Sequence, residues 1–410
     1  MPIKSIVKIA SWSLYDLAAK FFTLNIVTLH FARWITIGKN TANIYYGLAF
    51  GISSLIALLF SPFVGRISDL TGRRNSILTF LTILSAALVV LLGFTHNVFL
   101  ALVFFALAKL FIQLAMIVYN ALISEVAPVN RLGLVSGFGK MLGFIGALVI
   151  LYLMAPLKED YGYHRLFQVS GLLFFLFSLP CIIATRNKNS KQEKEKNKIT
   201  SFRHLVITFK STLSSLKSLC EEVEGIKDLL KASFFILCPV NVLILFMAVY
   251  LTKVFGLDDL AIVNVIATAT IAAIVSSISF GALGDRIGHK KILYPVFTLM
   301  FISFILVSLG TARVHAFWLG ALFGLIYGAL MAVPRALAVA IVPKEKIGEF
   351  FGFFAWMGYI AGFIGPLVWG LVLLVLNPLA VLRYRIAMVL LGLFIIPALY
   401  YFIRVPERKY

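Results

Sequence analysis

Acidic residues are scarce in this chain: Asp and Glu together number 17 among 410 residues, against 37 Lys and Arg. Charged residues make up 13% of the sequence and hydrophobic residues 61%, whereas soluble domains have about 25% and 45–50%. This composition excludes an ordinary soluble fold. The net charge of +20 does not indicate a nucleic-acid partner, because the basic residues lie in the gaps between apolar runs, where they set membrane topology.

Cysteines and catalytic motifs are scarce as well. The three cysteines, Cys181, Cys220 and Cys238, have neither metal-ligand nor disulfide spacing. The chain contains no G-x-x-x-x-G-K-[ST] loop, no H-E-x-x-H pair and no nucleophile placed beside a base. We therefore predict no enzymatic activity, no metal and no cofactor. Any energy for function must come from an ion gradient or from the gradient of a solute.

What the chain does contain is a series of apolar runs, each long enough to cross a bilayer. The first six lie near 9–32, 43–64, 75–94, 97–121, 133–156 and 166–185, and the second six near 231–254, 261–283, 290–310, 315–341, 348–376 and 385–404. The pattern predicts an all-α polytopic membrane protein with twelve transmembrane helices. We expect two pseudo-symmetric six-helix bundles, 1–185 and 231–410, joined by a linker over 186–230.

The predicted linker has two parts of different character. Residues 186–198 are highly charged and predict a solvated, flexible segment. Residues 202–230 place apolar side chains at three- and four-residue steps beside several Lys and Arg, which predicts an amphipathic helix in the cytoplasmic interface. A helix packed against the protein itself would show the same pattern.

One short phrase occurs twice, as GRISDLTGRR from Gly65 and as GALGDRIGHKK from Gly281. Gly, Asp, Gly and a basic pair recur at matched spacing, and each copy lies between two apolar runs. A duplicated charged turn indicates two copies of one membrane unit, an organisation typical of transporters.

The aspartate of each turn lies at a helix end beside basic residues. Such a carboxylate can cap the N-terminus of a neighbouring helix and pair with an Arg in the partner half, as a latch that holds one face closed. Alternatively, the charges only set topology. A further basic residue follows a proline near the inner end of the helix at 315–341. The residues that we assign to gating are Asp69, Arg73, Arg74, Asp285, Arg286, Lys290 and Arg335.

Twelve helices, two halves and a G-x-x-x-D-x-x-G-[RH]-[RK] turn in both halves resemble the major facilitator superfamily. Four stretches more narrowly resemble its branch of vacuolar, autophagy-related amino-acid effluxers: SWSLYDLAAKFF (11–22), VYNALISEVAP (118–128), LVSGFGKMLGFIGA (134–147) and EFFGFFAWMGYIAGFIGPLVWGLV (349–372). The resemblance implies a secondary transporter that works by alternating access. The chain departs from the branch over 17–20 and at CPVN (238–241), so the substrate of those relatives is not carried over.

Ionisable residues inside the apolar runs are few: Asp16, Lys20, Lys109, Lys140 and Arg335. They are informative because an unpaired charge in hydrocarbon is costly. Asp16 and Lys20 are four residues apart, so they share a helix face and can pair. Lys20 and Lys109 lie near mid-bilayer by helix rise, and the family resemblance places their helices around a central cavity. For Lys140, reaching toward an interface is an equally good explanation.

An excess of cations over carboxylates favours a solute that carries a carboxylate or a phosphate, such as an amino acid or an organic acid. We assign substrate binding to Lys20, Lys109, Gln113, Asn120 and Asn241. Asp16 is assigned to proton coupling, because a membrane carboxylate near a lysine can change its charge state as solvent access changes sides. A static pair with Lys20 is the alternative role.

Two other functions fit the same sequence. An abundance of Phe, 37 residues, suits a largely apolar cavity and therefore an exporter of amphipathic drug-like or lipid-like molecules. The second alternative is a membrane receptor or scaffold that transports nothing.

The distribution of Lys and Arg predicts the orientation of the chain. Basic residues concentrate in the segments that face the cytoplasm when the N-terminus is inside. We predict a multi-pass protein of the plasma membrane with both termini cytoplasmic, which works as a monomer in the lipid bilayer. Its partners would be a small-molecule substrate and a co-transported proton.

Overall fold

The computed structural model describes residues 3–31, 34–35, 39, 43–186, 211, 214–311 and 313–406. These residues are almost entirely helical, and no strand occurs among them. Ten helices in this part of the chain are long and apolar enough to cross a membrane. The predicted all-α polytopic fold is confirmed.

The predicted helices correspond closely to those in the structure. The first sequence half contains α1 (Ile3–Phe22), the π-helix η1 (Thr23–His30), α3 (Asn43–Thr71), α4 (Arg74–Leu92), α5 (Val98–Val126) and α6 (Leu132–Ala184). The second half contains α9 (Ile226–Phe255), α10 (Asp259–Ile287), α11 (His289–Leu309), α12 (Arg313–Ile341), α13 (Ile347–Val375), α14 (Leu382–Leu393) and α15 (Ile395–Ile403). Short 3₁₀ helices, η3 (Val129–Arg131), η5 (Lys344–Lys346) and η6 (Asn377–Leu379), precede α6, α13 and α14.

Two of the predicted helices lie within α6. Gly162 inside it has φ 74° and ψ −179°, which are not helical angles. Glycine adopts a positive φ without the steric cost that a Cβ would impose. The helices predicted at 133–156 and 166–185 therefore lie on the two sides of this break.

Local side-chain chemistry sets several helix ends. The Asn97 side chain accepts a hydrogen bond from the Leu100 amide at the start of α5, and the Asp258 side chain accepts one from the Ala261 amide at the start of α10. Asn and Asp are preferred at this position because the first amides of a helix have no partner within it. Gly256, with φ 63°, ends α9.

The described chain divides into two compact units. Unit 1 comprises Met1–Pro128, Phe138–Ser214 and Pro343–Gly352, and unit 2 comprises Val129–Gly137, Ser215–Val342 and Phe353–Tyr410. The units follow the two sequence halves except for two short segments. The start of α6 belongs to unit 2, and the start of α13 belongs to unit 1.

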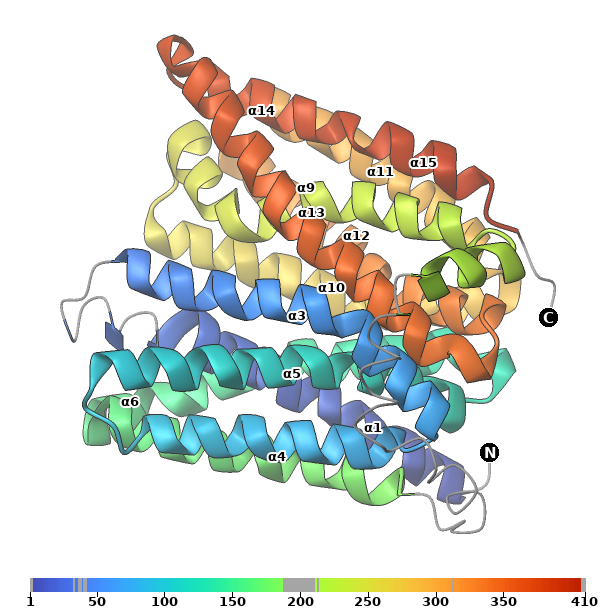
Figure 1. Cartoon of the computed structure of the whole chain (residues 1–410). Coiled ribbons are helices and arrows are strands. Elements are labelled where there is room, and N and C mark those ends of the chain that lie inside the picture. The colour runs from blue at the N-terminus through green and yellow to red at the C-terminus, as the bar shows by residue number, and fades with distance from the viewer. Residues whose placement is uncertain are drawn as a thin grey trace. The chain divides into compact units, whose positions relative to one another are not determined.

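Equivalent helices pack alike in the two units. In unit 1, α3 and α4 both pack on α5 (Figure 1). In unit 2, α10 and α11 both pack on α12. Helices α3 and α4 flank the first repeated turn, and α10 and α11 flank the second. The internal repeat in the sequence is therefore accompanied by a repeat in packing.

Only part of the predicted linker lies among the described residues. Residues 187–210, which contain most of the predicted charged segment and the start of the amphipathic helix, lie outside them. The chain is helical over 214–222, and Leu219 and Val223 are buried in unit 2. For this stretch the burial favours a helix packed against the protein over one in the lipid interface.

Candidate functional site

A buried ion pair lies between α1 and the first part of α6. Lys140 Nζ is 2.6 Å from Asp16 Oδ1, and the Asp16 side chain is 2% exposed. The other carboxylate oxygen, Oδ2, accepts a hydrogen bond of 2.8 Å from the Tyr119 hydroxyl on α5. Three helices therefore meet at one acidic group, and each of its oxygens has a donor.

Aromatic side chains hold the Tyr119 hydroxyl in place. The Tyr119 ring stacks on Trp12 and on Tyr15, with centroid distances of 4.7 and 4.8 Å. Trp12 Nε1 donates to the Tyr119 carbonyl oxygen at 3.3 Å, and the Tyr15 and Thr82 hydroxyl oxygens are 2.7 Å apart. All three rings are fully buried. The Asp16 carboxylate is thus positioned by a tightly packed aromatic frame.

The structure corrects the predicted pairing of Asp16 with Lys20, because the ion-pair partner is Lys140. Helices α1 and α6 approach closely at Gly143, where an added Cβ would lie 3.2 Å from the Asp16 carbonyl oxygen and 3.1 Å from Lys20 Cγ. This approach brings Lys140 across the helix contact to Asp16. Spacing along one helix reveals only neighbours on that helix, so it could not predict this pair.

Lys20 lies one turn beyond Asp16 on α1 and is half-buried. Its ammonium is 5.5 Å from the centre of the Phe144 ring on α6, within the range of a cation–π contact. Within the described part of the chain, no carboxylate and no hydrogen-bond acceptor contacts the ammonium. Its charge is therefore not neutralised by these side chains.

Lys109 is buried between α5 and α3 and is surrounded by neutral groups. Its Nζ is 2.6 Å from the Ser54 hydroxyl oxygen, 3.0 Å from that of Ser53, and 3.3 Å from both the Phe50 carbonyl oxygen and Gln113 Oε1. The Phe50 ring centre is 3.7 Å away. An ammonium has three protons, so its hydrogen bonds are satisfied. No described carboxylate lies within ion-pair distance to balance its charge.

The two predicted asparagines lie in different surroundings. Asn120 is half-buried on α5 of unit 1. Asn241 on α9 of unit 2 donates from Nδ2 to the carbonyl oxygen of Leu237 in its own helix, at 2.8 Å. Two of the predicted substrate residues, Lys109 and Gln113, are thus hydrogen-bonded to each other. A third, Lys20, lies beside the Asp16–Lys140 pair.

The aspartate of the first repeated turn caps a helix. Asp69 Oδ1 and Oδ2 accept hydrogen bonds of 3.0 and 2.8 Å from the backbone amides of Gly348 and Glu349 in the first turn of α13. Both helix ends belong to unit 1. We call this contact the first latch. The predicted capping of a neighbouring helix is confirmed by these bonds.

The cation of the first latch comes from its own turn rather than from the partner half. Arg74 lies 2.7 Å from Asp69 Oδ1 and 2.8 Å from Glu125 Oε1 on α5. It also donates to the Lys344 carbonyl oxygen at 2.6 Å. Arg74 is buried, whereas the neighbouring Arg73 is half-buried. Arg74 is therefore the residue of the pair that holds the latch.

The second repeated turn forms an equivalent latch within unit 2. Asp285 Oδ1 and Oδ2 each accept a hydrogen bond of 2.7 Å, from the amides of Gly133 and Leu134 in the first turn of α6. His289 Nε2 lies 3.3 Å from Asp285 Oδ1. Lys290 is directed elsewhere, because its ammonium donates to the Ile403 carbonyl oxygen at 2.9 Å.

Arg335 reinforces the second latch. Its guanidinium donates from Nε to the Ser136 hydroxyl oxygen and from Nη2 to the Ser136 carbonyl oxygen, both at 2.8 Å. The Ser136 hydroxyl in turn donates to the Ala332 carbonyl oxygen at 2.7 Å. The start of α6 is thus bound to α12 as well as to α10. Arg286, by contrast, is exposed.

Several participants were missed by reasoning from sequence. Tyr119 and Ser136 carry no motif of their own, and only the folded contacts reveal them. His289 lies in the second repeated turn, at the [RH] position of the pattern, but only the fold shows its contact with Asp285. Ser53 and Ser54 form an adjacent polar pair within an apolar run, which is a signal that could have marked a partner for Lys109.

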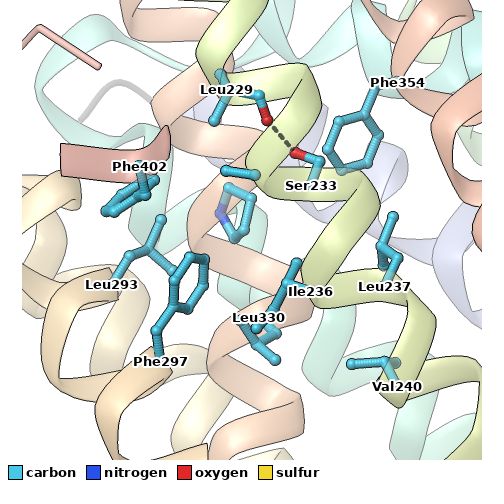
Figure 2. A pocket seen from close by; sticks show the side chains of 12 residues that line it. Leu229, Ser233, Ile236, Leu237, Val240, Leu293, Phe297, Leu330, Phe354 and Phe402 are labelled. Carbon is cyan, nitrogen blue, oxygen red and sulfur yellow. Dashed lines mark hydrogen bonds between the residues drawn. The ribbon is translucent and has the colours of Figure 1, made fainter. Parts of the chain in front are cut away.

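An apolar cavity lies in unit 2, away from these polar groups. Figure 2 shows it among residues of α9, α11 and α12, with Phe354 and Phe402 at its edges. Ser233 is the polar side chain among its lining residues, and its hydroxyl donates to the Leu229 carbonyl oxygen at 2.6 Å. None of the residues assigned to substrate binding lines this cavity.

Paired helix repeats, buried intramembrane charges and carboxylate-capped helix ends define a polytopic membrane transporter. Comparison with known families gives its particular class. The sequence profile of the Major Facilitator Superfamily matches residues 17–366 and 229–410, and the chain belongs to this family. It is therefore a multi-pass secondary transporter and not an enzyme, as predicted.

Relatives span nearly the full chain at low identity. An uncharacterized protein of Aquifex aeolicus is 24% identical over 94% of this chain and 93% of its own length. The uncharacterized transporter YxiO of Bacillus subtilis is 24% identical, covering 87% and 86% of the two chains. The multidrug resistance protein MdtG of Proteus mirabilis is 28% identical, covering 90% and 88%.

Two solved structures share the fold. The proton:xylose symporter XylE superposes with a TM-score of 0.71 at 15% identity, covering 99% of this chain and 96% of XylE. The human organic anion transporter MFSD10 superposes with a TM-score of 0.70 at 14% identity, covering 99% and 100%. The likeness to vacuolar amino-acid effluxers stays a prediction, because the relatives named here carry other descriptions.

Proposed function

We propose that this transporter carries a small organic anion or zwitterion, such as an amino acid or an organic acid, by alternating access. The observation that carries the proposal is the ammonium of Lys20, which is half-buried and lacks a counter-ion among the described residues. A charge inside the membrane is costly unless it is paired. A carboxylate or phosphate of the substrate would provide that pairing.

Lys109 adds to the positive potential of unit 1. Its contacts are hydroxyl, carbonyl and amide oxygens, which satisfy its protons without cancelling its charge. Of the lysines at 20, 109 and 140, only Lys140 is paired with a carboxylate in the described chain. This imbalance of charge supports an anionic substrate. Gln113, beside Lys109, would then supply a polar contact, and Asn120 of the same unit a further one.

We assign proton coupling to Asp16. Its carboxylate is held by one cation, Lys140, and by one hydroxyl, that of Tyr119. Protonation of Asp16 would release Lys140 from the pair and change the charge of the site by one unit. A substrate anion at Lys20, one helical turn away, would respond to that change through space.

The two latches supply the gating part of the proposal. In each latch, the carboxylate accepts hydrogen bonds from two backbone amides at the start of a helix. That helix belongs to the other half of the sequence. Hydrogen bonds from a helix N-terminus to a carboxylate are charge-assisted and therefore strong. Alternating access would require Asp69 and Asp285 to release and re-form these bonds.

A second candidate substrate is an amphipathic, drug-like molecule. It is favoured by the MdtG relatives, which are described as multidrug resistance proteins. The Phe144 ring against Lys20 would suit a molecule with an apolar body and an anionic group. We further propose a monomer in the plasma membrane with both termini cytoplasmic, on the distribution of Lys and Arg.

The test is solute binding by purified protein, measured by thermal shift with carboxylates, zwitterions, cations and amphipathic drugs, followed by flux in liposomes. A ligand at 100 times its Kd stabilises a protein by about 2.7 kcal/mol. We expect a carboxylate-bearing solute to give the shift, Lys20→Met to abolish it and Lys20→Arg to retain it.

Stabilisation by uncharged or cationic solutes alone would overturn the anionic substrate. If Lys20→Met and the wild type show the same thermal shift, Lys20 does not bind the solute. Stabilisation and flux with amphipathic drugs only would establish the second candidate.

A further inference from the structure

The two latches differ in the cation that accompanies the aspartate. In the first latch, Asp69 is paired with the guanidinium of Arg74 at 2.7 Å. In the second, the basic group beside Asp285 is the imidazole of His289, at 3.3 Å. An arginine stays charged at all physiological pH values, whereas a histidine changes its charge between about pH 5 and 8. The same cap is therefore built once with a permanent cation and once with a titratable one.

The surroundings of His289 tie it closely to the second latch. Its side chain is 1% exposed, and its Nε2 would lie 2.8 Å from a Cβ added at Gly133. Gly133 is also the residue whose amide donates to Asp285. The imidazole thus touches the capping carboxylate on α10 and the capped turn of α6.

The other charged side chains at this site are basic. Lys290 and Lys291 follow on α11, Arg286 is on α10, Arg131 precedes α6, and Arg335 on α12 binds Ser136 in the capped turn. Lys290 is directed to the Ile403 carbonyl oxygen, and Arg286 and Arg131 are exposed. Among the described residues that pack here, Asp285 is the acidic group in contact with the imidazole.

We propose that His289 is a positioning residue that makes the second latch weaken as the pH rises and the imidazole loses its charge. A protonated imidazole forms an ion pair with Asp285 and holds the carboxylate in its capping position. A neutral imidazole leaves a nearly buried carboxylate without that cation, which weakens the cap. The inference rests on the proposed gating role for its link to transport, but the cap itself can be measured without transport.

The experiment is hydrogen–deuterium exchange on the full-length protein in lipid nanodiscs at about pH 5.5 and pH 8.5, which bracket the ordinary titration of histidine. Exchange is corrected for the intrinsic effect of pH. The peptide that covers 131–137 reports the Gly133 and Leu134 amides, and the peptide that covers 345–351 reports the Gly348 and Glu349 amides of the first latch. The second peptide is the comparison, because the cation beside Asp69 is the permanent charge of Arg74.

We expect the corrected protection of 131–137 to fall about tenfold from the acidic to the basic condition, the scale of one hydrogen bond to a charged group. Protection of 345–351 should not fall, because Arg74 beside Asp69 stays charged over this range. In His289→Gln the protection of 131–137 should be low at both pH values. A parallel fall in both peptides from the acidic to the basic condition, no change in 131–137, or a fall that survives in His289→Gln would overturn the proposal.

If His289→Gln does not fold, the comparison of the two peptides in the wild-type protein still decides the proposal. The substrate class is a separate question, because no solute is present in this experiment. A failure to find an anionic substrate would therefore leave the result of the exchange measurement intact.

Discussion

At the scale of single residues, the buried charges of unit 1 are handled in three different ways. Asp16 and Lys140 neutralise each other. Lys109 has its hydrogen bonds satisfied by neutral oxygens, and Lys20 has an aromatic ring beside it. Only the first arrangement removes charge from the site. The other two leave a positive potential that a substrate anion would sense.

The Asp16–Lys140 pair yields a prediction about stability and coupling. Asp16→Asn leaves the Lys140 ammonium without its carboxylate, which costs about 3–5 kcal/mol for a buried pair. We expect a lower melting temperature for Asp16→Asn and recovery in the double variant Asp16→Asn/Lys140→Met, because the stranded charge is then absent. Thermal unfolding of the purified variants measures both.

Transport by the double variant separates coupling from a structural role. If Asp16 carries the coupling proton, the restored protein should exchange substrate across liposomes without accumulating it in response to a pH gradient. Accumulation equal to that of wild type would show that the pair only joins α1 to α6.

At the scale of helices, the latches bring helix ends together at glycines. A Cβ added at Gly65 would overlap the Gly348 carbonyl oxygen, and one added at Gly133 would overlap that of Gly281. Small residues permit such approach in lipid, where apolarity alone does not drive helices together. The capping bonds of Asp69 and Asp285 form only because the backbones come this close.

Two glycines of α3 provide a matched test of this contact. Gly65→Ala should destabilise unit 1 by about 1–3 kcal/mol, the usual cost of overpacking. Gly51 has no atom within 4 Å of an added Cβ, so Gly51→Ala should stabilise the helix by about 0.4–1 kcal/mol. Melting temperatures in detergent should therefore move in opposite directions. A fall of similar size in both variants would contradict the contact with Gly348.

At the scale of the whole molecule, the charges outside the helices predict orientation. The chain has 37 Lys and Arg against 17 Asp and Glu, and the basic residues concentrate in the segments that face the cytoplasm when the N-terminus is inside. Because basic loops are retained in the cytoplasm, both chain ends should lie there.

Reporter fusions in a bacterial host test this orientation. Green fluorescent protein fused after Tyr410 should fluoresce, and alkaline phosphatase at the same position should be inactive. At Leu257, in the turn between α9 and α10, fused green fluorescent protein should not fluoresce and fused alkaline phosphatase should be active. Active phosphatase at the C-terminus would show the opposite orientation.

Much of the fold was determined by the sequence itself. The length of each apolar run determines a span, and the Asn or Asp before α5 and α10 marks where those helices begin. The repeated turn indicated two related halves and predicted that Asp69 and Asp285 would cap helices. These properties depend on neighbouring residues along the chain, so they can be recognised without the fold.

The choice of partner for each charge was decided only by the tertiary structure. Asp16 pairs with Lys140 instead of Lys20 because α1 and α6 touch at Gly143. Asp285 has a histidine beside it and Asp69 an arginine, although both turns carry a basic pair. Contacts between helices depend on which faces meet and how closely, and one sequence does not record that. Where the helices approach each other therefore determines which of these charges are neutralised by a carboxylate.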